Sequence, residues 1–155
     1  PWRPRLLRVE RSGDDVAVTV HGATEAVVAL YIDLNGLAGI GSTRLMGGRR
    51  EAVRARDAWE FAVLASSAAG ALWRVGPRAP SRLEDLPVTM EGDALRLTLP
   101  GKRLRGNPSA WGFLLVTSDE RGEGAAGLLG STEDQKRLSA GAPPPVLRAV
   151  RLLER

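Results

Sequence analysis

Residues 86–99 read LPVTMEGDALRLTL and give the clearest indication of the fold. After the Glu-Gly-Asp turn, the leucines at every second position from Leu95 to Leu99 fall on one side of an extended chain, and Arg96 and Thr98 fall on the other. This period of two predicts a strand with one buried and one exposed face. Together with the turn, it predicts a β-hairpin over the whole stretch.

The same signals recur along the chain. Residues 7–11 and 16–20 alternate on either side of a Ser-Gly-Asp-Asp turn, which predicts a second hairpin. Residues 26–33 and 111–119 are nearly continuous apolar runs, which predict strands buried on both faces. Further strands are expected over residues 51–56, 59–64 and 71–75. Many short strands without intervening helices predict an all-β fold, an antiparallel β-sandwich of two sheets formed by residues 1–155 as a single domain.

The remaining stretches predict loops. Residues 34–48 form a long Gly-rich segment, which is either a functional loop or a crossover between the two sheets. Residues 77–87 contain three prolines, and residues 120–145 are expected to be a long Gly/Pro-rich loop region. Residues 146–153 suit either a terminal strand or a short helix.

Composition excludes several classes of function. The 155 residues include no Cys and one His, and they contain none of the common nucleophile, phosphate-loop or zinc motifs, so we expect no catalysis. The net charge of +4 comes from arginines that are interspersed with acidic residues, so no nucleic-acid partner is expected. No apolar run approaches the roughly 20 residues of a membrane-spanning helix, so no membrane span is expected.

The order of short motifs from residue 26 to residue 119 resembles a known family. A strand ending Tyr-Ile-Asp opens a Gly-rich loop, which is followed by a Trp-bearing strand, a returning strand, a hairpin ending Leu-Pro and a late Trp-Gly-Phe strand. These motifs are Tyr31-Ile32-Asp33, Leu45-Met46-Gly47-Gly48-Arg49, Trp59-Glu60-Phe61, Leu72-Trp73-Arg74, Leu99-Pro100 and Trp111-Gly112-Phe113. The pattern is similar to that of the DOMON-like β-sandwiches, above all the glucodextranase C-terminal domain family and, more distantly, the family 9 carbohydrate-binding modules.

The resemblance implies a non-catalytic module that accompanies a polysaccharide-active enzyme or lies on the outside of the cell. Its partner would be a polysaccharide or oligosaccharide, or a neighbouring enzyme domain. A structural or protein-interaction domain with no soluble ligand is the alternative. Other DOMON-like domains bind haem through Met, His or Lys, for which His21, Met46 and Met90 are the candidates among the first two types.

Sugar binding by such a module needs exposed aromatic rings with polar groups beside them. Trp73, flanked by Leu72 and Arg74, is the strongest candidate for an exposed ring, and Trp111 and Trp59 are the further candidates. Each of the latter two shares a strand face with a Phe two residues later, an arrangement more typical of a core. The polar contacts near the long loop are expected from Arg49 or Asp33.

Asp33 and Asn35 could also ligate calcium, which binds carboxylate and amide oxygens. Two such donors are fewer than the 6–8 ligands that calcium takes, so other oxygens would have to contribute. The alternative is that Asp33-Leu34-Asn35-Gly36 is turn chemistry alone, and we favour this interpretation. No other cofactor is expected.

Overall fold

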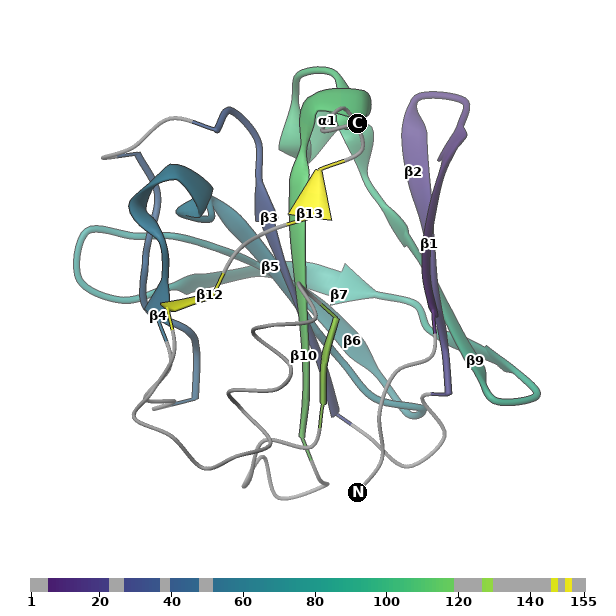
Figure 1. Ribbon diagram of the computed structural model, residues 1–155. Coiled ribbons are helices and arrows are strands. Elements are labelled where there is room, and N and C mark those ends of the chain that lie inside the picture. The colour runs from purple at the N-terminus through teal and green to yellow at the C-terminus, as the bar shows by residue number, and fades with distance from the viewer. Residues whose placement is uncertain are drawn as a thin grey trace.

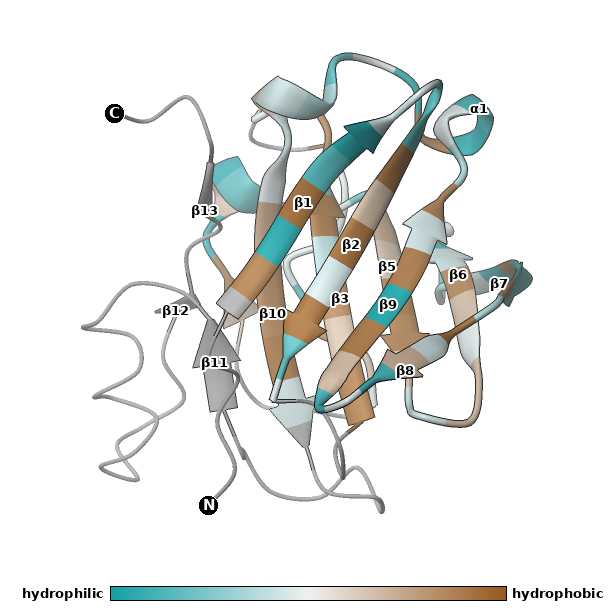
Figure 2. Cartoon of the chain, turned by 90° about the vertical axis from the view of Figure 1, so that its right-hand side faces the viewer, coloured by the Kyte–Doolittle hydropathy of each residue, from teal (hydrophilic) through white to brown (hydrophobic). Residues whose placement is uncertain are grey.

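The chain folds into two antiparallel β-sheets packed face to face, as Figures 1 and 2 show. The computed structural model describes residues 6–22, 27–36, 40–47, 52–118, 127–129, 146–147 and 150–151. Within these ranges, none of the helices has the length and apolar character needed to cross a bilayer. The arrangement of the two sheets confirms the predicted all-β sandwich. The assignment of the whole chain to one domain stays a prediction.

The smaller sheet has four strands and contains both predicted hairpins. Its order is β1 (Leu6–Ser12), β2 (Asp15–His21), β9 (Ala94–Leu99) and β8 (Thr89–Glu91). β2 pairs with β9 so that Val18 lies opposite Leu97. Because both strands alternate with the same period, this register places Val16, Val18 and Val20 of β2 on the same face of the sheet as Leu95, Leu97 and Leu99 of β9. Figure 2 shows the alternation as stripes along β2 and β9.

The larger sheet places the two predicted apolar strands side by side. Its main path runs β10 (Gly112–Ser118), β3 (Val27–Asp33), β5 (Phe61–Ala65), β6 (Gly70–Arg74) and β7 (Ser81–Leu86). The short strands β11 (Gly127–Leu129) and β13 (Val150–Arg151) pair with β10 as well. β4 (Ala52–Val53) and β12 (Val146–Leu147) form a separate parallel pair. For residues 146–153 the sequence allows a strand or a short helix; the described residues 146–147 and 150–151 form strands.

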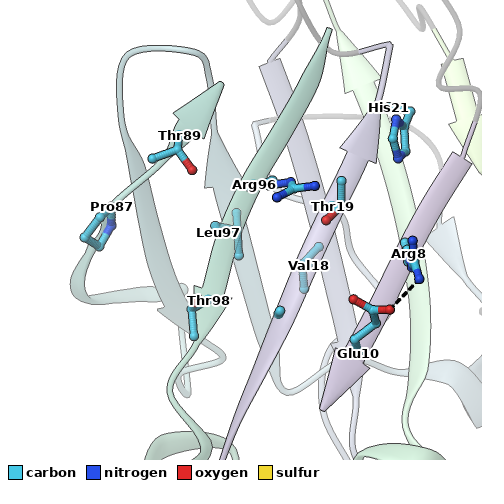
Figure 3. Close-up of a pocket in the computed structure, with 11 residues that line it drawn as sticks. Arg8, Glu10, Val18, Thr19, His21, Pro87, Thr89, Arg96, Leu97 and Thr98 are labelled. Atoms are coloured by element: carbon cyan, nitrogen blue, oxygen red, sulfur yellow. Dashed lines mark ion pairs between the residues drawn. The ribbon is translucent and has the colours of Figure 1, made fainter. Parts of the chain in front are cut away.

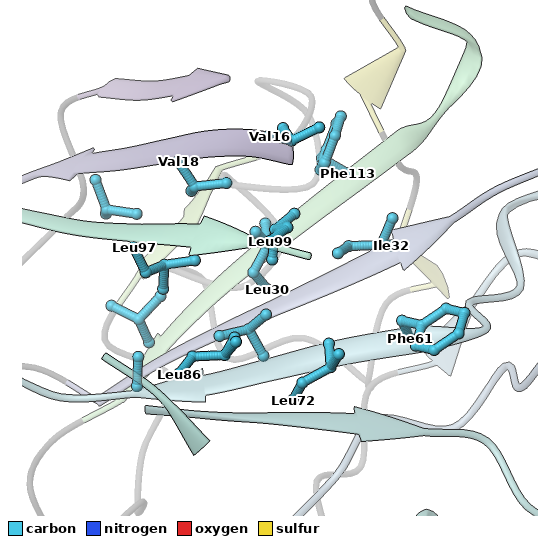
Figure 4. Close-up of a cluster of buried hydrophobic side chains, with 14 of the residues drawn as sticks. Val16, Val18, Leu30, Ile32, Phe61, Leu72, Leu86, Leu97, Leu99 and Phe113 are labelled. Atoms are coloured by element: carbon cyan, nitrogen blue, oxygen red, sulfur yellow. The ribbon is translucent and has the colours of Figure 1, made fainter. Parts of the chain in front are cut away.

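The core lies between the two sheets. Figure 4 shows valines and leucines of β2 and β9 facing leucine, isoleucine and phenylalanine side chains of the larger sheet. Leu30, Leu72, Leu99 and Leu115 are at most 1% exposed. The alternating leucines of β9 thus face the core as predicted, and the predicted exposure of Arg96 and Thr98 on the opposite face is also confirmed.

A second apolar cluster covers the outer face of the larger sheet. Tyr31, Ala62, Leu114 and Val116 on that face pack against Leu45, Val53 and Trp59, which come from the connection between β3 and β5. β3 and β5 are neighbours in one sheet. The crossover alternative for residues 34–48 is therefore wrong, because the chain leaves the sheet and returns to the strand next door. Residues 40–47 of this connection, with 52–59, lie over the sheet's outer face.

Three local predictions need correction. The strand expected over residues 51–56 is reduced to β4, because a 3-10 turn, Ala55–Asp57, follows it. The Pro-rich stretch 77–87 contains strand β7. Trp59 and Phe61 do not share a face, since the strand begins only at Phe61: Phe61 packs in the central core and Trp59 in the second cluster. One helical turn, α1 (Gly101–Leu104), and a 3-10 turn, Pro108–Ala110, occupy the loop after β9.

Candidate binding pocket

Trp73 lies on the outer face of the larger sheet, near the end of β6. Leu72 points into the core and is fully buried, so alternation along the strand directs Trp73 to the opposite side. The pairing of β6 with β7 shifts register between Leu72 and Trp73. Trp73 packs against the second apolar cluster but remains half-buried, whereas Trp59 in the same cluster is 1% exposed. Trp73 is therefore an aromatic ring at the open margin of this cluster.

A pocket of about 330 Å³ opens beside Trp73. Two segments far apart in sequence form its walls: residues 42–47 of the β3–β5 connection and residues 75–80 of the turn between β6 and β7. Leu45, Met46, Val75 and Pro80 supply apolar surface, and Arg44 and Arg78 are the charged residues that line it. The pocket thus combines one aromatic ring, an apolar lining and two cationic side chains.

Hydrogen bonds to two aromatic side chains hold the first wall in place. The Trp59 indole N–H donates to the Arg44 carbonyl at 2.9 Å, and the Met46 amide donates to the Tyr31 hydroxyl at 2.9 Å. The backbones of Ser42 and Trp59 exchange two further hydrogen bonds, of 2.8 and 2.9 Å. The segment that carries Arg44 and Met46 is therefore anchored to the sheet below it.

Gly41 permits this close approach. Its φ is +92°, in the region that favours glycine, and a Cβ at this position would lie 2.6 Å from the Trp59 carbonyl oxygen. Any side chain would push residues 40–47 away from Trp59. One of the glycines of the Gly-rich segment thus has a structural role at the wall of the pocket.

Trp59 and Trp111 have no exposed ring face in the structure. Both are 1% exposed: Trp59 packs beside Tyr31 with ring centroids 5.1 Å apart, and Trp111 packs beside Phe113 at 6.3 Å. A sugar stacks on an accessible ring face, so buried rings cannot serve as a binding surface. We therefore leave both tryptophans out of the candidate pocket and assign them to packing.

Asp33 and Asn35 form a turn rather than a part of the pocket. The Asp33 carboxylate, on a residue 1% exposed, accepts hydrogen bonds from the amides of Asn35 at 3.1 Å and Gly36 at 3.0 Å. This is the geometry of the turn that Asp-Leu-Asn-Gly predicts. Among the residues that the structure describes, no cluster of three or more His, Asp or Glu side chains is arranged to hold a metal ion.

Glu60 completes this turn and was not singled out from the sequence. Its carboxylate accepts hydrogen bonds from the Leu34 amide at 2.8 Å and the Asn35 side-chain amide at 2.7 Å. Burial raises the pKa of Glu60; the Leu34 hydrogen bond opposes this rise without cancelling it, and the nearby Asp33 carboxylate adds to it. Its position between two aromatic residues gave no sign of this role, because the partners lie in a distant segment.

A second hollow, of about 510 Å³, lies on the outer face of the four-stranded sheet. Figure 3 shows Arg8, Glu10, Thr19, His21 and Arg96 on this face, with the ion pair between Arg8 and Glu10 drawn as a dashed line. Among the described residues that line it there is no Trp, Tyr or Phe. These residues therefore offer no aromatic surface on which a pyranose could stack.

The remaining predicted residues are dispersed. Arg49 lies outside the described residues. The three haem-ligand candidates occupy different places: Met46 lines the Trp73 pocket, Met90 packs against the central core, and His21 lines the hollow of the four-stranded sheet. The structure thus does not bring these three residues together in one pocket.

Pocket residues Arg44, Arg78 and Pro80 were not expected from the sequence. Arg78 and Pro80 lie in the turn that follows Trp73, whereas Arg44 joins them only because the β3–β5 connection lies over the larger sheet. Nothing in the local sequence indicates that placement of Arg44. Comparisons of the chain with protein-family models, with curated proteins and with solved structures gave no match. The resemblance to the DOMON-like sandwiches therefore stays a prediction.

Proposed function

We propose that the chain is a non-catalytic carbohydrate-recognition module, an accessory to a polysaccharide-active or cell-surface protein, and that it binds sugar at the Trp73 pocket. The single observation that carries the proposal is the half-buried indole of Trp73 at the margin of an apolar cluster, beside a pocket of about 330 Å³. Figure 1 shows the larger sheet that bears it, with β6 beside β5. A β-sandwich of the DOMON-like type is consistent with this role.

The chemistry of the pocket suits a pyranose. The C–H groups on one side of a sugar ring are apolar and polarised, and they pack on the electron-rich face of an indole. Met46 and Pro80 extend the apolar surface around Trp73, while Arg44 and Ser42 place polar groups at the margin. Such a site can both bury one side of a sugar and orient its hydroxyl groups.

Binding at one ring is expected to be weak. A tryptophan contributes at most about 150–250 Å² of contact, and association costs remove much of the resulting free energy. A module of this kind gains useful retention by being tethered to a partner that holds it near the polymer. This is the physical reason for placing it beside another activity.

The test compares the wild-type chain with Trp73→Ala and Trp73→Phe. We expect the wild type to be retained on at least one insoluble polysaccharide of a broad panel and to show a change in tryptophan fluorescence with the matching oligosaccharide. Trp73→Ala should lose roughly tenfold or more in affinity, while Trp73→Phe, which keeps an aromatic face, should lose less. Far-UV circular dichroism and thermal unfolding establish that each variant is folded.

Two results would overturn the proposal. Wild-type protein that binds no glycan of the panel is not a carbohydrate module, and the alternative of a domain that docks against a neighbouring protein would then replace it. Sugar binding that is unchanged in folded Trp73→Ala would show that the site does not include Trp73.

A further inference from the structure

We infer that the sugar bound at the Trp73 pocket is acidic, carrying a carboxylate or a sulfate group that Arg44 and Arg78 recognise. This inference rests on the proposed function and deepens it, because it names the chemical class of the ligand. The charges of Arg44 and Arg78 support this inference, and the resemblance to other sandwiches implies nothing about them.

The charge that the described residues place around the pocket is of one sign. Arg44 and Arg78 are both exposed and both line it, and none of the described residues that line it is acidic. Several other arginines of the molecule have a carboxylate partner: Arg8 pairs with Glu10, Arg54 with Asp57, Arg82 with Asp85, Arg96 with Glu91 and Arg103 with Glu84. Within the described ranges, the guanidinium groups of Arg44 and Arg78 have no such partner. Their charge is therefore available to a ligand.

The backbone fixes the positions of both arginines. Arg44 donates its amide to the Ser42 hydroxyl at 3.1 Å, and its carbonyl accepts from the Trp59 indole at 2.9 Å. Arg78 lies in the turn between β6 and β7, where the Val75 amide donates to the Glu60 carbonyl at 2.9 Å and a Cβ on Gly76 would lie 2.5 Å from the Ala79 carbonyl oxygen. Because backbone contacts hold both walls, the Cα atoms of both arginines are placed before a ligand arrives, which lowers the entropic cost of binding.

The donors at this pocket favour an anion over a neutral sugar. A guanidinium offers only N–H donors, in a planar fork that matches a carboxylate or a sulfate. A neutral sugar presents hydroxyl groups that both donate and accept hydrogen bonds. A carboxylate side chain, which accepts from those hydroxyl groups, would complement it better than a second arginine, which can only donate. The side chains here supply two cationic donor groups and one hydroxyl, that of Ser42. The complementary ligand is an apolar ring with an acid group at its edge.

Because Arg44 and Arg78 are exposed, their preference for an acidic over a neutral sugar should be modest and should depend on salt. Exposed charge pairs are weak and screened, so two of them together should favour an acidic sugar by roughly tenfold at low salt. The Debye length shortens from about 30 Å at 0.01 M salt to about 8 Å at 0.15 M, so the preference for an acidic sugar should shrink over that range. A stacking contribution from Trp73 should remain.

The experiment uses three oligosaccharide arms and two matched double variants. The arms are trigalacturonate, its fully methyl-esterified neutral form and a sulfated galactose oligosaccharide; titration calorimetry at 0.01 and 0.15 M salt measures the affinities. The test variant is Arg44→Ala with Arg78→Ala. The control variant, Arg74→Ala with Lys102→Ala, removes the same charge from exposed residues that line a different pocket.

We expect an acidic arm to bind about tenfold more tightly than the methyl ester at 0.01 M salt, and the test variant, unlike the control variant, to abolish that preference. Preference for trigalacturonate identifies a carboxylate, and preference for the sulfated arm identifies a sulfate ester. Equal binding of acidic and neutral forms, or an equal loss in both double variants, would overturn the acidic ligand while leaving carbohydrate binding intact. No binding of any glycan by the wild type would instead overturn the proposed function.

Discussion

The outer faces of the two sheets have opposite characters. The outer face of the four-stranded sheet carries Arg8, Glu10, Thr19, Arg96 and Thr98, and no other segment of the described chain is needed to cover it (Figures 2 and 3). The outer face of the larger sheet is apolar and is covered by residues of the β3–β5 connection. One sheet is thus buried on one side and the other on both.

This difference explains where the candidate pocket lies. An apolar sheet face needs a cover, and a cover made from a loop ends somewhere on the sheet. At that margin, a side chain such as Trp73 is packed on one side and accessible on the other. The exposed polar face of the smaller sheet has no comparable margin, because its side chains are already in contact with solvent.

The largest expected effect comes from truncating the neighbours Leu114 and Leu115 on β10. Leu114 belongs to the covered outer face and Leu115 to the central core, and both are at most 1% exposed. Because the larger sheet is buried on both sides, Leu114→Ala and Leu115→Ala should each lower the free energy of unfolding by about 2–5 kcal/mol. Urea denaturation of the two variants measures both values.

The matched pair on the four-stranded sheet should behave differently. Leu97→Ala on the core side of β9 should be costly in the same way, whereas Thr98→Ala on the exposed side should change stability by no more than about 0.5 kcal/mol. If Leu114→Ala were as mild as Thr98→Ala, the cover over the larger sheet would not be part of the stable fold.

The same contrast explains how much of the fold could be predicted. A strand with one exposed face alternates, so the sequence could predict which side chains of residues 95–99 face the core. A strand buried on both faces, such as residues 27–33, is apolar throughout, which identifies it as central but does not say what lies on each side. Strand β7 was missed because its sequence, SRLEDL, is largely polar, as suits the edge of the larger sheet's main path.

The candidate site could be predicted only in part. Trp73 was found because it lies between Leu72 and Arg74 on a short strand. Arg44 and Arg78 were not found, because they belong to two connections whose proximity depends on the long-range contacts of residues 40–47. The burial of Trp59 was predicted for the wrong reason, since its packing partner is Tyr31 and not Phe61.

The next prediction concerns pH and the turn at the end of β3. The raised pKa of Glu60 means that the folded state binds its proton more tightly than the unfolded chain does. Glu60 therefore stabilises the fold while it is protonated, at acidic pH, and this contribution is lost as the pH rises from the ordinary glutamate pKa through the raised one. Glu60→Gln makes this side chain neutral at every pH. The Asn35 side-chain amide can flip, so that its oxygen accepts a hydrogen bond from the new side-chain N–H.

Unfolding curves of wild type and Glu60→Gln across this pH range give the measurement. We expect the wild type to lose stability relative to Glu60→Gln as the pH rises, with the difference becoming constant above the raised pKa. A difference that is independent of pH would mean that Glu60 is not desolvated as the structure indicates. Thr98→Ala on the exposed face of the four-stranded sheet is the control, because it neither removes nor adds a titratable group.

The smallest expected effect belongs to the exposed face of the four-stranded sheet. Arg96 on β9 and Glu91 on β8 form an ion pair of 2.7 Å, with side chains 53% and 66% exposed. Water screens such a pair, and fixing two long side chains costs entropy, so its coupling energy should be about 0.2–1 kcal/mol and should fall with added salt. A double-mutant cycle with Arg96→Ala and Glu91→Ala measures that coupling directly. A coupling of several kcal/mol that resists salt would require this face to be shielded from water, and the contrast between an exposed and a covered sheet would then fail.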